Sequence, residues 1–150
     1  MNEKIRIDPP FFFFAYLLMG VIIYYFFPVA NFISPPLTYL GIPVILFGVA
    51  IELWADSLFK KNKTTVKPHG RPSILVTEGP FGLSRHPMYT GFILILFGLT
   101  LILGNIFVVL APIAMFFTLE ILFIPFEEQA LEEIFKDKYV EYQNRVRKWL

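Results

Sequence analysis

The sequence predicts an all-α integral-membrane protein with four transmembrane helices arranged as two hairpins, followed by a cytoplasmic amphipathic helix at the C-terminus. Three observations support this fold class. The 150-residue chain is 56% hydrophobic and contains 18 Phe residues, which is more apolar surface than a water-soluble domain of this length can bury. Its apolar residues form long runs. Its 13 Lys and Arg residues lie only near the two ends and between alternate runs.

The apolar runs define the expected spans. Two runs flank the Pro35-Pro36 turn, and a longer run extends over residues 88–126. As one helix the long run would measure roughly 58 Å, about twice the thickness of the hydrocarbon core of a bilayer. It is therefore expected to fold back, and Gly104-Asn105 is its best turn signal. Within one domain over 1–150, the expected spans are about 11–33, 37–59, 88–104 and 106–126.

The basic residues predict the orientation of these spans. Lys4 and Arg6 precede the first run, a second group lies in the loop 60–87, and the remainder belong to the tail 127–150. The other two loops contain no Lys or Arg. The positive-inside rule then places both termini and the loop 60–87 in the cytoplasm, as in a multi-pass protein of the inner membrane. The first run is read as a retained span, since Pro28-Val29-Ala30 is a poor signal-peptide cleavage site.

Composition excludes several classes of partner. The net charge of +1 argues against nucleic-acid binding. With no Cys and two His, no metal site is expected. The oligomeric state is left open. Glycines within the expected spans indicate close helix packing; these are Gly41, Gly48, Gly91 and Gly98.

The tail 127–150 is too polar to cross a membrane, but its apolar residues recur every three or four positions. This spacing predicts one face of a helix, or of two short helices, lying on the membrane or covering the cytoplasmic ends of the spans. A plain interfacial anchor is the alternative interpretation.

Two potentially cationic residues, Arg85 and His86, directly precede Pro87, a residue favoured at the first position of a helix. The helix dipole disfavours cations at this position by ~0.3–1 kcal/mol. In one interpretation Arg85 reaches lipid headgroups and His86 has no special role. In the other, both side chains and the free backbone N–H groups of the helix bind an anion.

An acid pair, Glu127 and Glu128, follows the fourth expected span. Because the turn at Gly104-Asn105 makes the third and fourth spans neighbours, the acid pair should lie level with Arg85 and His86. The acids are either first-turn residues of a helix beginning at Pro125, or part of a site for a small zwitterionic ligand.

Two blocks of the sequence resemble a known family. The segment LVTEGPFGLSRHPMYTG (75–91) resembles the motif G-P-[FY]-x-x-x-R-[HN]-P-x-Y-x-G of integral-membrane methyltransferases. These are the isoprenylcysteine carboxyl methyltransferase and phospholipid methyltransferase families, and the upstream TTVKPH (64–69) is similar to the loop of bacterial members. The tail is similar to the ending of these families, except that Lys136 follows Phe135 where they usually have Gly.

The resemblance implies a methyltransferase that takes its methyl group from S-adenosylmethionine and releases S-adenosylhomocysteine. The cofactor would lie at the cytoplasmic end of the second hairpin, between the loop 60–87 (the cofactor loop), the start of the third span and the acid pair. The cofactor-binding residues implied are Leu75, Val76, Gly79, Pro80, Arg85, His86, Tyr89, Glu127 and Glu128.

The resemblance also implies a lipophilic or lipid acceptor that enters from the bilayer: a lipid amine, or a prenylcysteine-like carboxylate or thiol. Eukaryotic prenylcysteine enzymes have an Arg for the substrate carboxylate a few residues before the acid pair. Here Phe123-Ile124-Pro125 occupies that neighbourhood, which favours a bacterial or archaeal lipid-like acceptor.

The expected chemistry is an in-line methyl transfer, to which alignment of the two reactants can contribute ~7–11 kcal/mol. An amine acceptor must first lose a proton to a base. The predicted catalytic residues are Glu128, Glu120 and Arg85. Glu120 is chosen as the deepest acid of the fourth span; alternatively it is buried against a Lys, Tyr or Trp partner, or it reaches the headgroups.

Two other functions compete with this prediction. The first is a non-enzymatic small membrane protein that retains the methyltransferase scaffold. The second is a reductase related to the sterol reductases, which is disfavoured because the chain is short and shows no site for a second nucleotide.

Overall fold

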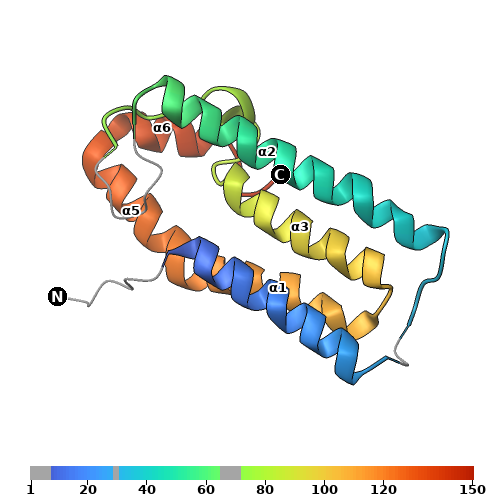
Figure 1. The fold of residues 1–150 in the computed structure, drawn as a ribbon. Helices are drawn as coiled ribbons and strands as arrows, with labels where there is room; N and C mark the ends of the chain where they lie inside the picture. Colours follow the sequence, from blue (N-terminus) through green and yellow to red (C-terminus); the bar gives the residue numbers. More distant parts are fainter. Residues whose placement is uncertain (1–7, 29–30, 65–71) are drawn as a thin grey trace.

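The structure is a computed structural model that describes residues 8–28, 31–64 and 72–150. Its elements are all helical and lie side by side in a bundle (Figure 1). The α-helices are α1 (Pro9–Phe26), α2 (Gly41–Lys61), α3 (Pro87–Leu103), α4 (Leu110–Thr118), α5 (Ile124–Phe135) and α6 (Asp137–Arg145). Shorter helical turns are Leu37–Leu40, Gly79–Gly82, Ile106–Val109 and Leu119–Phe123.

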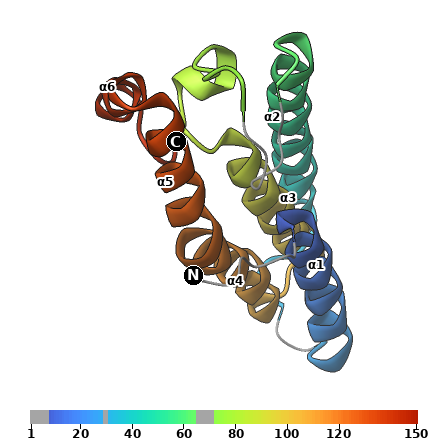
Figure 2. The same cartoon turned by 90° about the vertical axis from the view of Figure 1, so that its left-hand side faces the viewer.

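One end of the bundle gathers segments that are far apart in the sequence. The starts of α1, α3 and α5 lie there, together with the end of α2, while α6 and the C-terminus cover this end (Figures 1 and 2). The end of α1, the start of α2 and the turn between α3 and α4 lie at the opposite end (Figure 1). At that opposite end Phe32 N donates to Gly104 O at 2.8 Å and Asn105 Nδ2 donates to Phe27 O at 2.6 Å. The second expected hairpin is present, since α3 and α4 pack together. Among the described residues the first is not a packed pair: α1 packs against α4 and α3, whereas α2 packs against α3.

The first helix is shorter than the expected span over 11–33. It ends at Phe26, and Phe27 already has a non-helical backbone with φ −125° and ψ 59°. The cause is Pro28, because the residue before a proline is pushed out of the helical region by the proline ring. Phe32 and Ile33, which the expected span included, therefore lie outside α1.

Helices α2 and α3 pack closely through paired glycines. Gly41 lies opposite Gly98, and Gly48 lies opposite Gly91. A Cβ atom added to Gly48 would lie 2.9 Å from Gly91 O, so only glycine allows this approach of the two backbones. This confirms the packing expected for these glycines, and it fixes the position of α3, whose first turn carries part of the candidate site.

The turn between α3 and α4 lies where the sequence predicts it. Gly104 adopts a left-handed conformation with φ +62° and ends α3, as glycine often does at this position. Asn105 then accepts a hydrogen bond from Phe107 N at 2.9 Å and caps the next helical turn. At the other end of α3, Pro87 is the first helical residue, as expected.

The second half of the second hairpin differs from the prediction. The helical path does not end near residue 126 but continues from Ile106 through α4, the widened turn Leu119–Phe123 and α5 to Phe135. The widened turn is a π-helical segment that directly precedes Pro125. Proline has no N–H to donate to the carbonyl four residues earlier, which accounts for a local change of helical pitch rather than a break. The expected tail helix is thus divided into α5, continuous with the span, and the separate α6.

The break between α5 and α6 lies at Lys136, which has φ +48° and ψ −125°. This is the position where the resembling families usually have Gly, and the conformation is one that glycine adopts without strain. A non-glycine residue held there costs on the order of 1–3 kcal/mol.

Replacing Lys136 by Gly is therefore expected to raise the free energy of unfolding by about 1 kcal/mol, after the greater freedom of glycine in the unfolded chain is subtracted. Thermal unfolding of the detergent-purified protein would measure it. The matched control is Glu141→Gly within α6, which should destabilise by about 1 kcal/mol. Equal losses in both variants would show that Lys136 is not strained.

Within the described residues, three helices are long and apolar enough to cross a membrane: Pro9–Phe26, Leu37–Lys61 and Ile106–Phe135. Helix α3 is also apolar but has 17 residues. Large hydrophobic side chains such as Phe14, Leu46 and Phe117 are more than half exposed on these helices. A surface of this kind is suited to lipid, so the protein is a multi-pass membrane protein.

Candidate functional site

The segment that leads into α3 contacts α2 through Gly79 and the C-terminal residues through Ser84. Gly79, at the start of the turn Gly79–Gly82, has φ +60°, and a Cβ atom there would lie 2.9 Å from Leu58 Cδ1 of α2. Ser84 is fully buried; its Oγ accepts from His86 N at 3.2 Å and donates to Lys148 O at 2.9 Å. These contacts fix the backbone from which Arg85 and His86 extend.

Glu128 binds both cations of this segment. Its Oε1 lies 3.0 Å from Arg85 Nε, 2.8 Å from Arg85 Nη2 and 3.1 Å from His86 Nε2. The side chains of Arg85 and Glu128 are only 12% and 17% exposed, so water screens these pairs weakly. The acid on α5 thus offsets the unfavourable position of two cations at the start of α3. This confirms that the acid pair and Arg85-His86 lie at one level.

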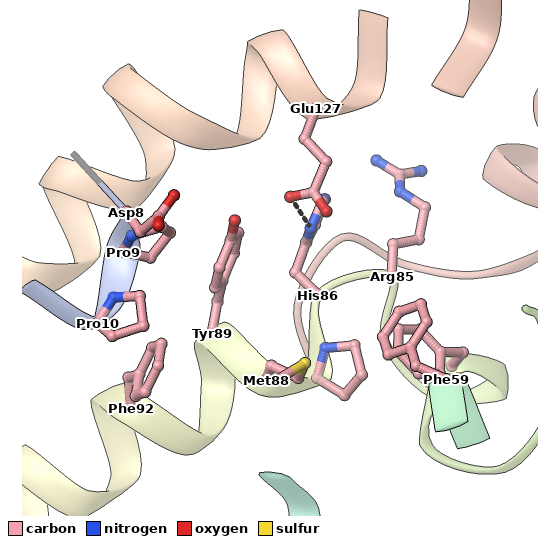
Figure 3. A pocket seen from close by; sticks show the side chains of 12 residues that line it. Asp8, Pro9, Pro10, Phe59, Arg85, His86, Met88, Tyr89, Phe92 and Glu127 are labelled. Atoms are coloured by element: carbon pink, nitrogen blue, oxygen red, sulfur yellow. Dashed lines mark ion pairs between the residues drawn. The ribbon is translucent and has the colours of Figure 1, made fainter. Parts of the chain in front are cut away.

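Glu127 and Tyr89 both contact His86. Glu127 Oε2 is 3.6 Å from His86 Nδ1, and the Tyr89 ring stacks on the imidazole with centroids 5.5 Å apart and planes 6° apart. Figure 3 shows Glu127 pointing from α5 toward His86, with Tyr89 beside it. Glu127 Oε2 is buried and has no hydrogen-bond partner among the residues that the structure describes. A buried carboxylate oxygen without a partner is expected to bind something that the protein itself does not supply.

Two opposing effects act on the pKa of His86. Burial lowers it, whereas the hydrogen bond to Glu128 and the nearby carboxylates of both Glu127 and Glu128 raise it, and the net result is a pKa above the ordinary 6.5. The two carboxylates therefore favour the protonated form of His86.

This raised pKa predicts how stability depends on pH. Because the folded-state pKa exceeds the unfolded value, the stabilisation by protonated His86 is complete below about pH 6.5 and is lost as the pH rises through the folded pKa. The difference in melting temperature between wild type and His86→Gln should therefore shrink as the pH is raised from 6 to 9. A difference that is constant over this range would show that His86 is not protonated in the folded protein.

A cavity of about 190 Å³ adjoins these residues. Apolar and aromatic side chains from α1, α2 and α3 form most of its wall, and Glu127 and Asp8 contribute carboxylates (Figure 3). The lining residues are Asp8, Pro9, Pro10, Phe59, Phe81, Arg85, His86, Pro87, Met88, Tyr89, Phe92 and Glu127.

The structure brings together five of the residues predicted from the sequence. Four of them line the cavity, namely Arg85, His86, Tyr89 and Glu127. Glu128 does not line it but pairs with Arg85 and His86.

The other predicted residues lie elsewhere. Val76 and Pro80 are buried, Leu75 packs against a cluster formed by the tail, and Gly79 packs against α2. Glu120 does not line the cavity either, since its carboxylate binds Lys148 Nζ at 2.6 Å and Trp149 Nε1 at 3.1 Å. For these residues a role in binding or catalysis stays a prediction.

Sequence reasoning missed several lining residues, among them Asp8, Phe59 and Phe92. For Asp8 and Phe59 the sequence indicated only the face of the membrane, and for Phe92 it indicated the helix face. The positive-inside rule placed the residues before the first span, which include Asp8, at the same membrane face as Arg85. It placed the end of the second span, which is Phe59, at that face as well. Phe92 follows Tyr89 by three positions and therefore shares its helix face.

Comparison with known proteins decides the family. Residues 37–138 match the family model "Phospholipid methyltransferase", which covers more than half of the chain. The chain belongs to this family. It is also 38% identical over 110 residues to Protein-S-isoprenylcysteine O-methyltransferase B of Arabidopsis thaliana, an alignment that covers 73% of this chain and 54% of the relative. The chain thus spans about half the length of this curated relative.

Membership of a membrane methyltransferase family confirms the resemblance derived from the two sequence blocks. The family match includes Arg85, His86, Glu127 and Glu128, which form the ion-pair cluster. It does not include Asp8 at the start of α1, nor the C-terminal residues that contact Arg85. Asp8 and the contacts of Arg85 with Gln143 and Val146 therefore involve residues outside the matched region.

Proposed function

We propose that the protein transfers a methyl group from S-adenosylmethionine to a lipophilic acceptor at the surface of the membrane. The observation that carries this proposal is the cavity between α1, α3 and α5, in which an ion-pair cluster meets an apolar and aromatic wall. Such a site suits both a charged methyl donor and a lipophilic acceptor.

The residues of the site fit the donor. Its amino acid part carries an ammonium and a carboxylate, and its sulfonium adds a positive charge. Glu127 Oε2, which accepts no hydrogen bond from the described residues, suits the ammonium or the sulfonium, and the faces of Tyr89 and Phe92 suit a cation or the adenine ring. The carboxylate suits the first-turn N–H groups of α3 at Met88 and Tyr89, which have no intrahelical acceptor. The bound donor supplies an electrophilic methyl group.

The cavity wall favours an amine over a carboxylate as the acceptor. A carboxylate needs a free cation, but Arg85 donates to Glu128, Gln143 O and Val146 O, and His86 is held by both acids. The wall instead offers Asp8 and Glu127, which can attract an ammonium group and accept its proton before transfer. We infer that a lipid amine is the acceptor.

The proposed site lies at the cytoplasmic face of a protein with four spans. Helix α3 is about 25 Å long and packs against α2 through glycines, which suits a fourth crossing. Lys60, Lys61, Arg85 and Lys136 all belong to the end of the bundle that carries the site, and the positive-inside rule favours the cytoplasm for this end.

Calorimetry of the detergent-purified protein with S-adenosylmethionine tests the donor. Incubation with donor carrying a labelled methyl group and a lipid extract, followed by mass spectrometry, tests the acceptor. The expected result is saturable binding, with the label on an amine-containing lipid. Folded wild-type protein that binds no donor would contradict the proposal and favour a non-enzymatic protein with the same scaffold. Label on a carboxylate would contradict the amine assignment alone.

A further inference from the structure

The C-terminal segment Gln143–Trp149, named here the strap, crosses the start of α3 and binds it through backbone carbonyls. Arg85 and Ser84 donate the hydrogen bonds. The acceptors are Gln143 O and Val146 O for Arg85 Nη1 at 3.2 and 3.3 Å, Arg147 O for Arg85 N at 2.9 Å, and Lys148 O for Ser84 Oγ at 2.9 Å. Arg85 is thus held from one side by Glu128 and from the other by the strap.

The strap is itself clamped at its far end by Glu120. This acid lies in the widened turn of the long helix, where Oε1 accepts from Lys148 Nζ at 2.6 Å and Oε2 from Trp149 Nε1 at 3.1 Å. The Trp149 ring also packs on Phe116, with centroids 5.2 Å apart. Both oxygens of Glu120 are therefore engaged by the strap, and the side chain does not reach the cavity wall.

We propose that Glu120 is a positioning residue: it clamps the strap, and the strap orients Arg85 and, through Arg85, Glu128 at the cavity. An Arg side chain has many rotamers, so its orientation depends on acceptors that are themselves fixed. Releasing Lys148 and Trp149 frees the acceptors of Arg85 Nη1 to move, which loosens the Glu128–His86 pair as well. This inference rests on the proposed function for its consequence at the site, but the clamp itself is testable without any activity.

The clamp is tested kinetically with Glu120→Gln and Lys148→Met. Each should raise the KM for S-adenosylmethionine by about three- to tenfold, a range set by the modest strength of a partly exposed ion pair. The kcat at saturating donor should change by less than about twofold, because bound donor restores the geometry. Glu120→Lys combined with Lys148→Glu restores an ion pair and should recover most of the KM. A fall in kcat with Glu120→Gln alone, and none with Lys148→Met, would overturn the proposal in favour of a catalytic Glu120.

The strap is also testable by limited proteolysis with trypsin. Arg145 and Arg147 are exposed, and cleavage after either residue requires the strap to leave its hydrogen bonds. Glu120→Gln should speed release of the C-terminal peptides, measured by mass spectrometry, by about three- to tenfold. The matched control is Lys60→Met, which removes the ion pair with Asp56 on α2 and should leave cleavage and KM unchanged.

The two measurements separate the proposals. Wild-type cleavage and wild-type KM in Glu120→Gln would overturn the clamp. Faster cleavage with an unchanged KM would overturn the positioning role. Faster cleavage in a protein that binds no donor would support the clamp and contradict the proposed function instead.

Discussion

Replacing Glu128 by Gln is expected to abolish donor binding and to lower the free energy of unfolding by about 3 kcal/mol. Oε1 of this acid receives hydrogen bonds from both Arg85 and His86, whose side chains are 12% and 3% exposed. Removing the negative charge leaves Arg85 and His86 close together at the positive end of α3, with only Glu127, 3.6 Å from His86, to offset them. The expected loss is at the lower end for a buried pair, because Glu128 is itself 17% exposed.

Two variants on the same helix isolate this effect. Glu127→Gln removes a lining acid but leaves Arg85 paired with Glu128, so it should weaken donor binding with less loss of stability than Glu128→Gln. Glu132→Gln changes an exposed acid and should behave as wild type. Calorimetry for binding and thermal unfolding for stability give both readouts. Equal stability of the three variants would contradict the view that Glu128 neutralises the start of α3.

The sequence allowed the polar half of the site to be predicted, because simple local rules determine it. Pro87 starts a helix, Gly104-Asn105 reverses the chain, and this hairpin necessarily places Glu128 level with Arg85. The rest of the cavity wall depends on how α1 and α2 lie against α3, and no local pattern specifies this arrangement for Asp8 or Phe59.

Contacts of the tail could not be predicted for a different reason. The strap binds Arg85 through backbone carbonyls, and any residue type supplies a carbonyl. The continuity of Ile106–Phe135 was also missed, since Pro125 commonly begins a helix but here follows a widened helical turn. Glu120 was recognised as an unusual acid, and the Lys and Trp partners named as an alternative are those that the structure shows.

The second large effect is expected for Gly98→Leu, which should destabilise the protein by about 3 kcal/mol or more. A Cβ atom at Gly98 would lie 2.6 Å from Ile45 Cγ1 and 2.8 Å from Gly41 O. The second of these atoms belongs to the backbone of α2 and cannot turn away, so the two helices must separate. Gly98→Ala should show the same effect in smaller degree, about 1–3 kcal/mol, since only the Cβ atom is added.

The matched control is Gly82→Ala, where the nearest atom to an added Cβ is Thr77 O at 3.5 Å, an ordinary contact. Melting temperatures in detergent should therefore fall in the order Gly82→Ala, Gly98→Ala, Gly98→Leu, and a wild-type melting temperature for Gly98→Leu would refute close packing of α2 and α3. Separation of α2 and α3 also affects the site, because α2 contributes Phe59 and α3 contributes Tyr89 to the lining of the cavity. Moving the helices apart at Gly98 alters the distance between these two side chains. Any Gly98→Leu protein that still folds should therefore bind the donor more weakly than Gly82→Ala.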